Sequence, residues 1–216
     1  MFGIKSVYFY FIALQITFIK FLKRIYFTSN RYNVTLKTKI PQHTYYNPNS
    51  YLLSIITDYK AETFKVSEVD PNLFWLENNK KNSIQLHNFF WLSLVDRKTD
   101  GKNIKKIIYI WLLRNSNYKK IIWNTSTLSK RITSWILNID IILDNANFDF
   151  KRNFLSSIIS QTNHLKKNIK FEKDYLKKFE IFIALILSGL LFKDYEDNYK
   201  LGIGELENHI KVFFYS

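Results

Sequence analysis

The residues whose types could do chemistry are concentrated in two consecutive amphipathic segments, 128–143 and 150–169. Arg131, Trp135 and Asn138 recur at spacings of four and three, which places them on one face of a helix. A guanidinium pairs with a carboxylate through two parallel hydrogen bonds, and an indole offers a flat face to a sugar ring. This face therefore predicts contacts with an acidic sugar. The alternative interpretation is a core tryptophan beside an arginine that ties down a neighbouring helix end.

The second segment carries a stripe of polar side chains. Its members are Ser157, Gln161, His164 and Asn168. Their spacings of four, three and four align them along one side of a helix. Such a stripe lines a cleft or faces water, and its histidine is either a cleft contact or a structural group. We predict that Gln161 and His164 share a binding face with Arg131 and Trp135.

Metal and phosphate chemistry find no support in the sequence. The four histidines, which are His43, His87, His164 and His209, lie far apart, and no two stand at i and i+4. Glycine-rich phosphate loops and nucleophile elbows are missing too. Because the chain has no cysteine, disulfides, thiolate ligands and cysteine nucleophiles are excluded. We therefore predict no metal and no cofactor.

The segments that must position these residues are predicted to be helical. From residue 83 onward, apolar residues recur at helical spacing in six stretches: 83–95, 104–112, 128–143, 150–169, 172–192 and 199–214. The fifth stretch is apolar nearly all round, which predicts a buried inner helix. Helices of this length joined by short breaks predict stacked antiparallel αα-hairpins, and hence an all-α fold.

The composition indicates one basic domain. The chain has 216 residues, of which 47% are hydrophobic and 18% aromatic, so it can bury a sizeable core. Only 5 Gly and 3 Pro are present, whereas an all-β sandwich needs a turn every 8–12 residues or so. The net charge of +14 favours polyanionic partners, namely acidic polysaccharide, nucleic acid or anionic lipid, without choosing among them.

Residues 1–29 are apolar with basic residues at intervals. The uncharged run from Ser6 to Ile19 has 14 residues, whereas a membrane-spanning helix needs about 20. No small-residue cleavage site follows the run. We predict an amphipathic helix packed on the domain. A helix on a membrane surface and a signal anchor are the alternatives.

Residues 30–82 are predicted to be irregular or extended. Within them, 32–40 alternates apolar and polar residues as an exposed strand or extended arm does. Pro41 and Pro48, the latter between two asparagines, mark loops. The first fifty residues contain seven Lys or Arg and no Asp or Glu.

Five short motifs, in this order, resemble the heparinase II/III family. They are I-Q-L-H-N-F-F-W-L at 84–92, L-x-x-R-I-x-x-W-I-x-x-x-D at 128–140, F-L-x-S-I-I-x-Q-x-x-H-L at 154–165, A-L-I-L-S-G-L-L-F at 184–192 and G-I-x-x-L-E-N at 202–208. The resemblance implies that residues 83–216 form part of an incomplete α/α toroid. It also implies an acidic, uronic-acid polysaccharide as the partner, and it places His87 at the cleft.

The sequence departs from the family pattern in two places. Leu176 and Lys177 stand where the family's lyases carry an Asn-His pair. The family's tyrosine segment and its β-sandwich domain would follow Ser216. We therefore expect a chain that binds or acts on an acidic polysaccharide by β-elimination but is inactive alone, with no catalytic residue assigned. The expected substrate contacts are His87, Arg131, Trp135, Gln161 and His164.

Two other functions remain open. A nucleic-acid binder is disfavoured because no compact basic recognition helix occurs, and the lysines are spread over several helices as either a solvated face or an electropositive cleft. A membrane-surface protein would use residues 1–29. The predicted compartment is the bacterial cytoplasm or periplasm, with or without membrane association.

Overall fold

A computed structural model of the chain describes residues 4–41, 44, 70–75, 85–95 and 101–215. Within this part of the chain every regular element is a helix, which confirms the all-α prediction. Closure of the helices into a toroid stays a prediction. His43, Pro48, Ser83 and most of the segment 30–82 lie outside the described residues.

Eight α-helices are found in the described part of the chain. They are α1 (Ile4–Thr28), α2 (Asn30–Leu36), α5 (Gly101–Asn115), α6 (Thr125–Leu137), α7 (Ile139–Leu143), α8 (Phe148–Asn168), α9 (Tyr175–Leu191) and α10 (Glu196–Tyr215). The short 3-10 helices in this part of the chain are η1 (Leu73–Trp75), η2 (Phe90–Leu94), η3 (Ile169–Phe171) and η4 (Lys193–Tyr195).

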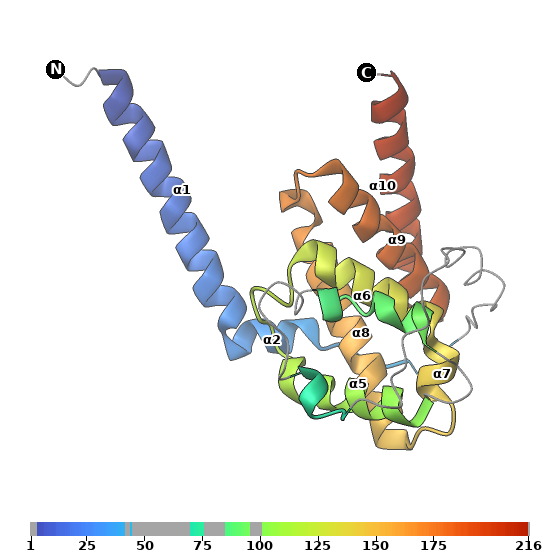
Figure 1. Cartoon of the computed structure of the whole chain (residues 1–216). Coiled ribbons are helices and arrows are strands. Elements are labelled where there is room, and N and C mark those ends of the chain that lie inside the picture. Colours follow the sequence, from blue (N-terminus) through green and yellow to red (C-terminus); the bar gives the residue numbers. More distant parts are fainter. Residues whose placement is uncertain (1–3, 42–43, 45–69, 76–84, 96–100, 216) are drawn as a thin grey trace.

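The core forms where α6 meets α8 and α9 (Figure 1). Ile132, Trp135 and Ile136 of α6 are fully buried there, with Phe154 of α8 and Leu185 of α9. Each fully buried side chain of this size stabilises the fold by about 1.5–3 kcal/mol. The inward residues of the predicted helices thus form the core.

The prediction of a buried inner helix is correct for the C-terminal half of α9, where the buried residues begin at Ile181, whereas Tyr175, Leu176 and Phe179 near its start are exposed. Helix α10 packs along α9. Two glycines bring the helices together. A Cβ on Gly189 would lie 2.4 Å from the backbone nitrogen of Tyr199, and one on Gly202 would lie 2.7 Å from the side chain of Ile186. Only a residue without a side chain permits this approach.

The predicted helix over 128–143 is divided in two at Asn138, which corrects that prediction. Asn138 has φ −111° and ψ 21°, outside the helical region, and it separates α6 from α7. Its amide Nδ2 donates to the carbonyl of Ser134 at 2.9 Å. Asparagine side chains compete in this way with the backbone hydrogen bonds of a helix.

The prediction of a strand or extended arm at 32–40 is wrong for its first half, which is α2. Ser29 caps this helix by accepting a hydrogen bond from the backbone N–H of Tyr32 at 3.1 Å. Tyr32 and Leu36 are both buried. A sequence that alternates apolar and polar residues also has apolar residues at i and i+4, which lie on one face of a helix. Because Tyr32 and Leu36 are such a pair, the helix buries both of them.

The segment 85–95 is a turn followed by η2, where the sequence predicts one helix. Phe89 has φ 61°, a left-handed conformation that ends the helical turn at Gln85–Leu86. The Asn88 side chain then accepts from the backbone N–H of Phe90 at 2.8 Å. Phe89 is fully buried, so its place in the core offsets an unfavourable backbone conformation.

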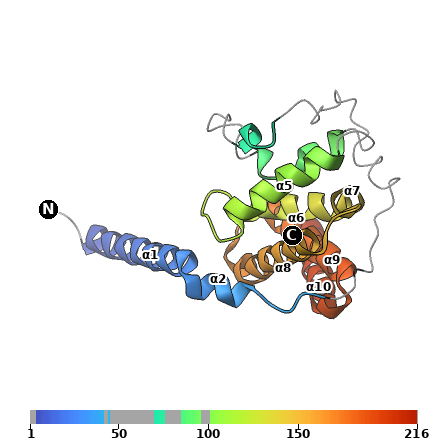
Figure 2. The same cartoon turned by 90° about the horizontal axis from the view of Figure 1, so that it is seen from below.

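Helix α1 extends away from the other helices, as both views show (Figures 1 and 2). Most of its apolar side chains are exposed, so the expectation that it packs on the domain is correct only near its C-terminal end. Among the described helices, none combines the length and the apolar character that a membrane span requires.

Candidate functional site

Arg131 lies in the interior, where α6 faces α8 and the 85–95 segment. Its side chain is 0% exposed. Nε donates to Oε1 of Gln161 at 2.6 Å, and Nη1 donates to the carbonyls of His87 at 2.9 Å and Ile122 at 3.1 Å. The guanidinium carbon lies 4.5 Å from the centre of the Trp111 ring. Arg131 therefore joins three segments of the chain through one side chain.

The charge of Arg131 is stabilised by neutral groups among the described residues. Its hydrogen-bond acceptors there are two carbonyls and one amide oxygen, and the ring of Trp111 adds a cation–π contact. Burial lowers the pKa of Arg131 well below its usual value, because desolvation disfavours the charged form. This environment resembles a structural clamp more than an open anion site.

His87 is held between aromatic rings. Its ring stacks on that of Trp75, with centres 5.1 Å apart and planes 10° apart. Its Nδ1 accepts from the indole N–H of Trp111 at 2.9 Å. An indole only donates, so Nδ1 carries no proton and the neutral ring is protonated at Nε2. Burial, with the nearby charges of Arg131 and Lys119, lowers the pKa of His87 to about 4.

His164 occupies a second aromatic cage, on the next turn of α8 after Gln161. Its Nδ1 lies 2.7 Å from the hydroxyl of Tyr32, and the rings of Tyr118 and Trp123 lie within 5.6 Å. Burial and the charges of Arg131 and Lys167 lower the pKa of His164 to about 4. Burial raises the pKa of Tyr32 to about 12. Both groups are therefore neutral at pH 7.

The polar stripe of α8 faces the interior. Nε2 of Gln161 donates to the hydroxyl of Ser157 at 2.8 Å, and Nδ2 of Asn168 donates to the carbonyl of His164 at 2.8 Å. All four side chains of the stripe are buried. Of these, Ser157 also borders a cavity of about 300 Å³.

The five predicted contact residues are thus brought close together. Four of them lie inside the core, and His87 is partly exposed. His87, Arg131 and Gln161 form one connected network. Trp135 is fully buried beside them, its ring centre 5.9 Å from the guanidinium carbon of Arg131, and His164 follows on α8. This burial fits the alternative interpretation, in which Trp135 belongs to the core and Arg131 ties neighbouring segments together. The buried His164 cannot reach a polysaccharide in this conformation, whereas His87 is only partly buried.

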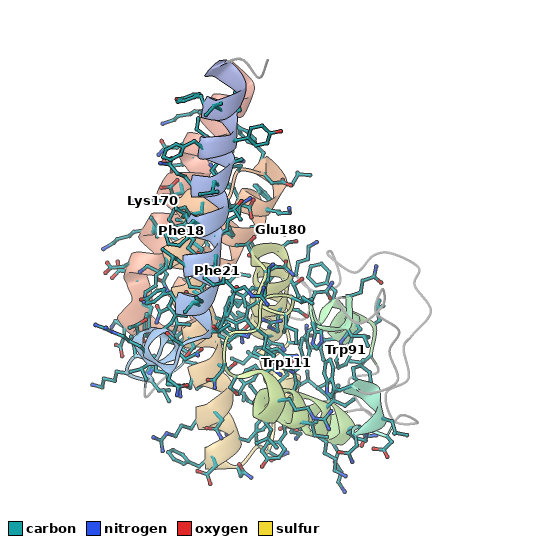
Figure 3. All side chains as sticks on the ribbon, turned by 90° about the vertical axis from the view of Figure 1, so that its left-hand side faces the viewer. Phe18, Phe21, Trp91, Trp111, Lys170 and Glu180 are labelled. Carbon is teal, nitrogen blue, oxygen red and sulfur yellow. The ribbon has the colours of Figure 1, made fainter. Side chains whose placement is uncertain are left out.

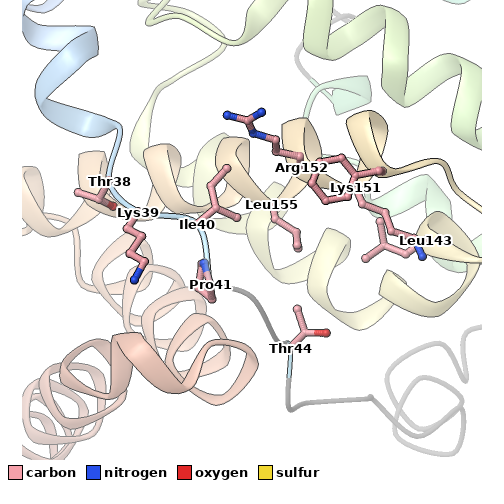
Figure 4. A pocket seen from close by; sticks show the side chains of 10 residues that line it. Thr38, Lys39, Ile40, Pro41, Thr44, Leu143, Lys151, Arg152 and Leu155 are labelled. Atoms are coloured by element: carbon pink, nitrogen blue, oxygen red, sulfur yellow. The ribbon is translucent and has the colours of Figure 1, made fainter.

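Another set of residues borders a cavity of about 900 Å³ beside the first turns of α8 (Figure 4). We call it the Lys39–Arg152 cavity. The described residues that line it are Thr38, Lys39, Ile40, Pro41, Thr44, Leu143, Phe148, Lys151, Arg152 and Leu155. Three of them are cationic and none is acidic. Phe148 is 76% exposed at this site, so its ring is free to contact a ligand.

Hydrogen bonds hold the 38–41 segment in place. The Tyr195 hydroxyl donates to the carbonyl of Lys39 at 2.7 Å, so the Thr38 hydroxyl donates to Tyr195 over their 2.6 Å contact. Nδ2 of Asn163, on α8, donates to the carbonyl of Leu36 at 2.8 Å. Asn147 caps the start of α8 by accepting from the backbone N–H of Phe150. Both walls of the cavity are therefore anchored.

The sequence interpretation missed Lys39, Lys151, Arg152 and Phe148. The adjacent Lys151 and Arg152 were a visible signal, but their pairing with Lys39 depends on the fold. The described residues contain no cluster of three metal-ligating side chains. Among known proteins, no family model, no curated protein and no solved structure matches the chain. Membership of the heparinase II/III family therefore stays a prediction.

Proposed function

We propose that this chain is a binding module for an acidic polysaccharide, which it holds in the Lys39–Arg152 cavity. The observation that carries the proposal is the set of cations at this site: Lys39, Lys151 and Arg152 border it without an acidic lining residue among those described. An arginine fork matches the two oxygens of a uronate carboxylate, and lysines add point charges.

The rest of the lining suits a sugar chain. The exposed ring of Phe148 offers an apolar face to the C–H groups of a pyranose, and Ile40 and Leu155 supply an apolar floor. The volume of about 900 Å³ falls within the usual range for ligand pockets, roughly 300–1,000 Å³. A cavity that combines an apolar floor with cations recognises an amphipathic anion.

The proposal concerns binding and not cleavage. β-Elimination needs a group that neutralises the uronate carboxylate, a base and an acid. The cations supply the first of these. The described lining residues include no histidine or tyrosine for the other two roles, and His87 and His164 lie elsewhere in the fold.

Calorimetric titration with polygalacturonate, alginate and heparin tests the proposal, with neutral dextran as the negative control. We expect binding to at least one acidic chain and none to dextran. Replacing Lys151→Ala and Arg152→Ala together should weaken it by tenfold or more, since charge-assisted hydrogen bonds are worth about 1.5–3 kcal/mol. Arg114→Ala with Lys120→Ala removes the same charge from exposed positions elsewhere and should change binding little.

Three results would overturn the proposal. The first is that no acidic polysaccharide binds. The second is that the two double variants weaken binding equally, which indicates attraction to net charge alone. The third is that duplex DNA binds as tightly as the best polysaccharide and responds to the same variants, which favours a nucleic-acid binder. Unsaturated uronate absorbance in the same mixtures reports lyase activity as a separate outcome.

A further inference from the structure

Helix α1 carries a continuous apolar face that the rest of the described chain leaves uncovered. The face consists of Val7, Phe11, Leu14, Phe18, Leu22 and Ile25, each 48–68% exposed. Their successive spacings are four, three, four, four and three residues. At about 100° per residue they fall within one sector of the helix.

This face points away from the domain. Near its C-terminal end, α1 touches the domain through Phe27, whose ring centre lies 4.7 Å from that of Tyr32, and through Lys23, whose Nζ lies 3.1 Å from the centre of the Phe171 ring. Phe27 follows Phe18 by nine residues, which is about half a turn round the helix. The domain therefore lies on the side of α1 opposite the apolar face; Figure 3, which labels Phe18, views α1 from its free side.

The charge of the helix identifies the kind of partner. In the C-terminal half of α1, Lys20, Lys23 and Arg24 lie on the side that faces the domain, whereas nearer the N-terminus that side carries the exposed Phe9 and Ile16. The first fifty residues contain seven Lys or Arg and no Asp or Glu. A helix with a wide apolar surface and cations gathered on the side opposite its centre lies in the plane of a membrane interface. Its cations are attracted to anionic lipid headgroups.

The width of the apolar surface favours lipid over a second copy of the chain. Pairing of two helices buries a narrow seam of residues. In α1, the exposed apolar residues continue beyond that seam on both flanks, at Tyr8, Ile19 and Tyr26 on one side and at Tyr10 and Phe21 on the other. Pairing with a second helix would leave these flanking residues in water, whereas a membrane interface would cover them. Tyrosine is also enriched where membranes meet water.

We propose that α1 docks this protein on an anionic membrane surface. The face defined by Val7, Phe11, Leu14, Phe18, Leu22 and Ile25 enters the boundary of the acyl chains. Lys20 and Arg24 lie at the level of the headgroups, and the domain stays on the water side because it contacts the opposite side of α1. This docking does not depend on the Lys39–Arg152 cavity.

Vesicle flotation tests the docking. The intact chain should float with vesicles that contain one third phosphatidylglycerol. Its partition coefficient for vesicles of pure phosphatidylcholine should be at least tenfold lower. Removing two cations, Lys20→Ala with Arg24→Ala, should lower partitioning to the anionic vesicles by about 25-fold, at about fivefold per charge. Phe11→Asp with Phe18→Asp should abolish it. These side chains are exposed, so unchanged circular dichroism is expected for both variants.

Matched controls come from exposed residues elsewhere. Leu113→Asp replaces an apolar side chain that is 68% exposed on α5, and Arg114→Ala with Lys120→Ala removes two exposed cations. Both should float like the unmodified chain. The docking proposal is overturned if the unmodified chain does not float, if it floats equally without anionic lipid, or if the controls lose as much as the α1 variants.

The orientation of α1 is measured separately, and the absence of cysteine from the chain makes this direct. A nitroxide label is attached to single cysteines placed in two sets, the first at 11, 14, 18 and 22 and the second at 13, 17, 20 and 24. Collisions of the label with oxygen and with a water-soluble nickel chelate report its depth in the membrane. An in-plane helix predicts a periodic depth, with the first set deep and the second shallow. A depth that increases or decreases steadily along the helix would contradict the proposal. So would a dimer that forms in the absence of vesicles and immobilises the labels on the apolar face.

Discussion

Arg131 and Gln161 are joined by a hydrogen bond of 2.6 Å from Nε–H to Oε1, which fastens α6 to α8 inside the core. Gln161 continues the connection by donating to Ser157 at 2.8 Å, and Ser134 of α6 donates to the carbonyl of Phe89 at 2.6 Å. The two helices and the 85–95 turn are therefore held by directional bonds as well as by apolar contacts.

A double-mutant cycle should measure this connection. Gln161→Ala leaves a buried donor of Arg131 without its partner, and we expect a loss of about 1–3 kcal/mol in the free energy of unfolding. With Arg131→Met as the second variant, the coupling energy should be about 1–3 kcal/mol. Urea unfolding gives these values. Gln15→Ala, at an exposed position of α1, should stay within about 0.5 kcal/mol, and a coupling near zero would contradict the structural role of the bond.

Stability should fall as the pH is lowered from about 6.5 to about 4. In the folded chain His87 and His164 each have a pKa lowered to about 4, chiefly by burial, whereas the unfolded value is about 6.5. Between these values the unfolded state binds more protons, so the contribution present above pH 6.5 is lost through this window. The loss should approach roughly 3 kcal/mol for the buried His164 and should be smaller for the partly exposed His87, whose charge water screens.

Urea unfolding at several pH values between 7 and 4 measures this slope. His87→Gln and His164→Gln each remove one titrating group and should make the slope shallower, whatever they do to the stability at pH 7. An equally steep slope in both variants would assign the acid sensitivity to other groups.

The close contact between α9 and α10 gives a prediction with an internal control. Gly189→Ala places a Cβ 2.4 Å from the backbone nitrogen of Tyr199, so the helices must separate, and we expect a loss of about 1–3 kcal/mol or more. Gly204, on the same α10, has no atom within 4 Å of an added Cβ. Gly204→Ala should therefore stabilise the protein by up to about 1 kcal/mol through helix propensity. Thermal unfolding of both variants measures the two changes in stability. An equal loss of stability in both variants would contradict the close packing of α9 against α10.

The sequence predicted the helical segments well where apolar periodicity and a cap coincide. The predicted helix at 150–169 is α8, capped by Asn147, and the predicted stretch at 172–192 contains α9, capped by Asp174. The break at Asn138 and the left-handed Phe89 were not predicted. Both depend on local hydrogen bonds and core contacts, which periodicity does not contain.

The position of the candidate site could not be predicted from helical spacing. Arg131 and Trp135 share a face in either interpretation, because spacing shows which residues lie together but not whether they meet solvent or another helix. The observed partners of Arg131 come from the 85–95 turn and from α8. The Lys39–Arg152 cavity likewise joins residues more than a hundred positions apart.

Zero-length cross-linking tests most directly whether an acidic sugar chain occupies the Lys39–Arg152 cavity. A carbodiimide joins uronate carboxylates to lysine amines only where they touch, and mass spectrometry then locates the modified lysines. With an oligogalacturonate that binds the protein, we predict modification of Lys39 and Lys151, and loss of the second site in Lys151→Arg, which keeps the charge. Modification concentrated on lysines outside the cavity, such as Lys102 and Lys106, would contradict the proposed site.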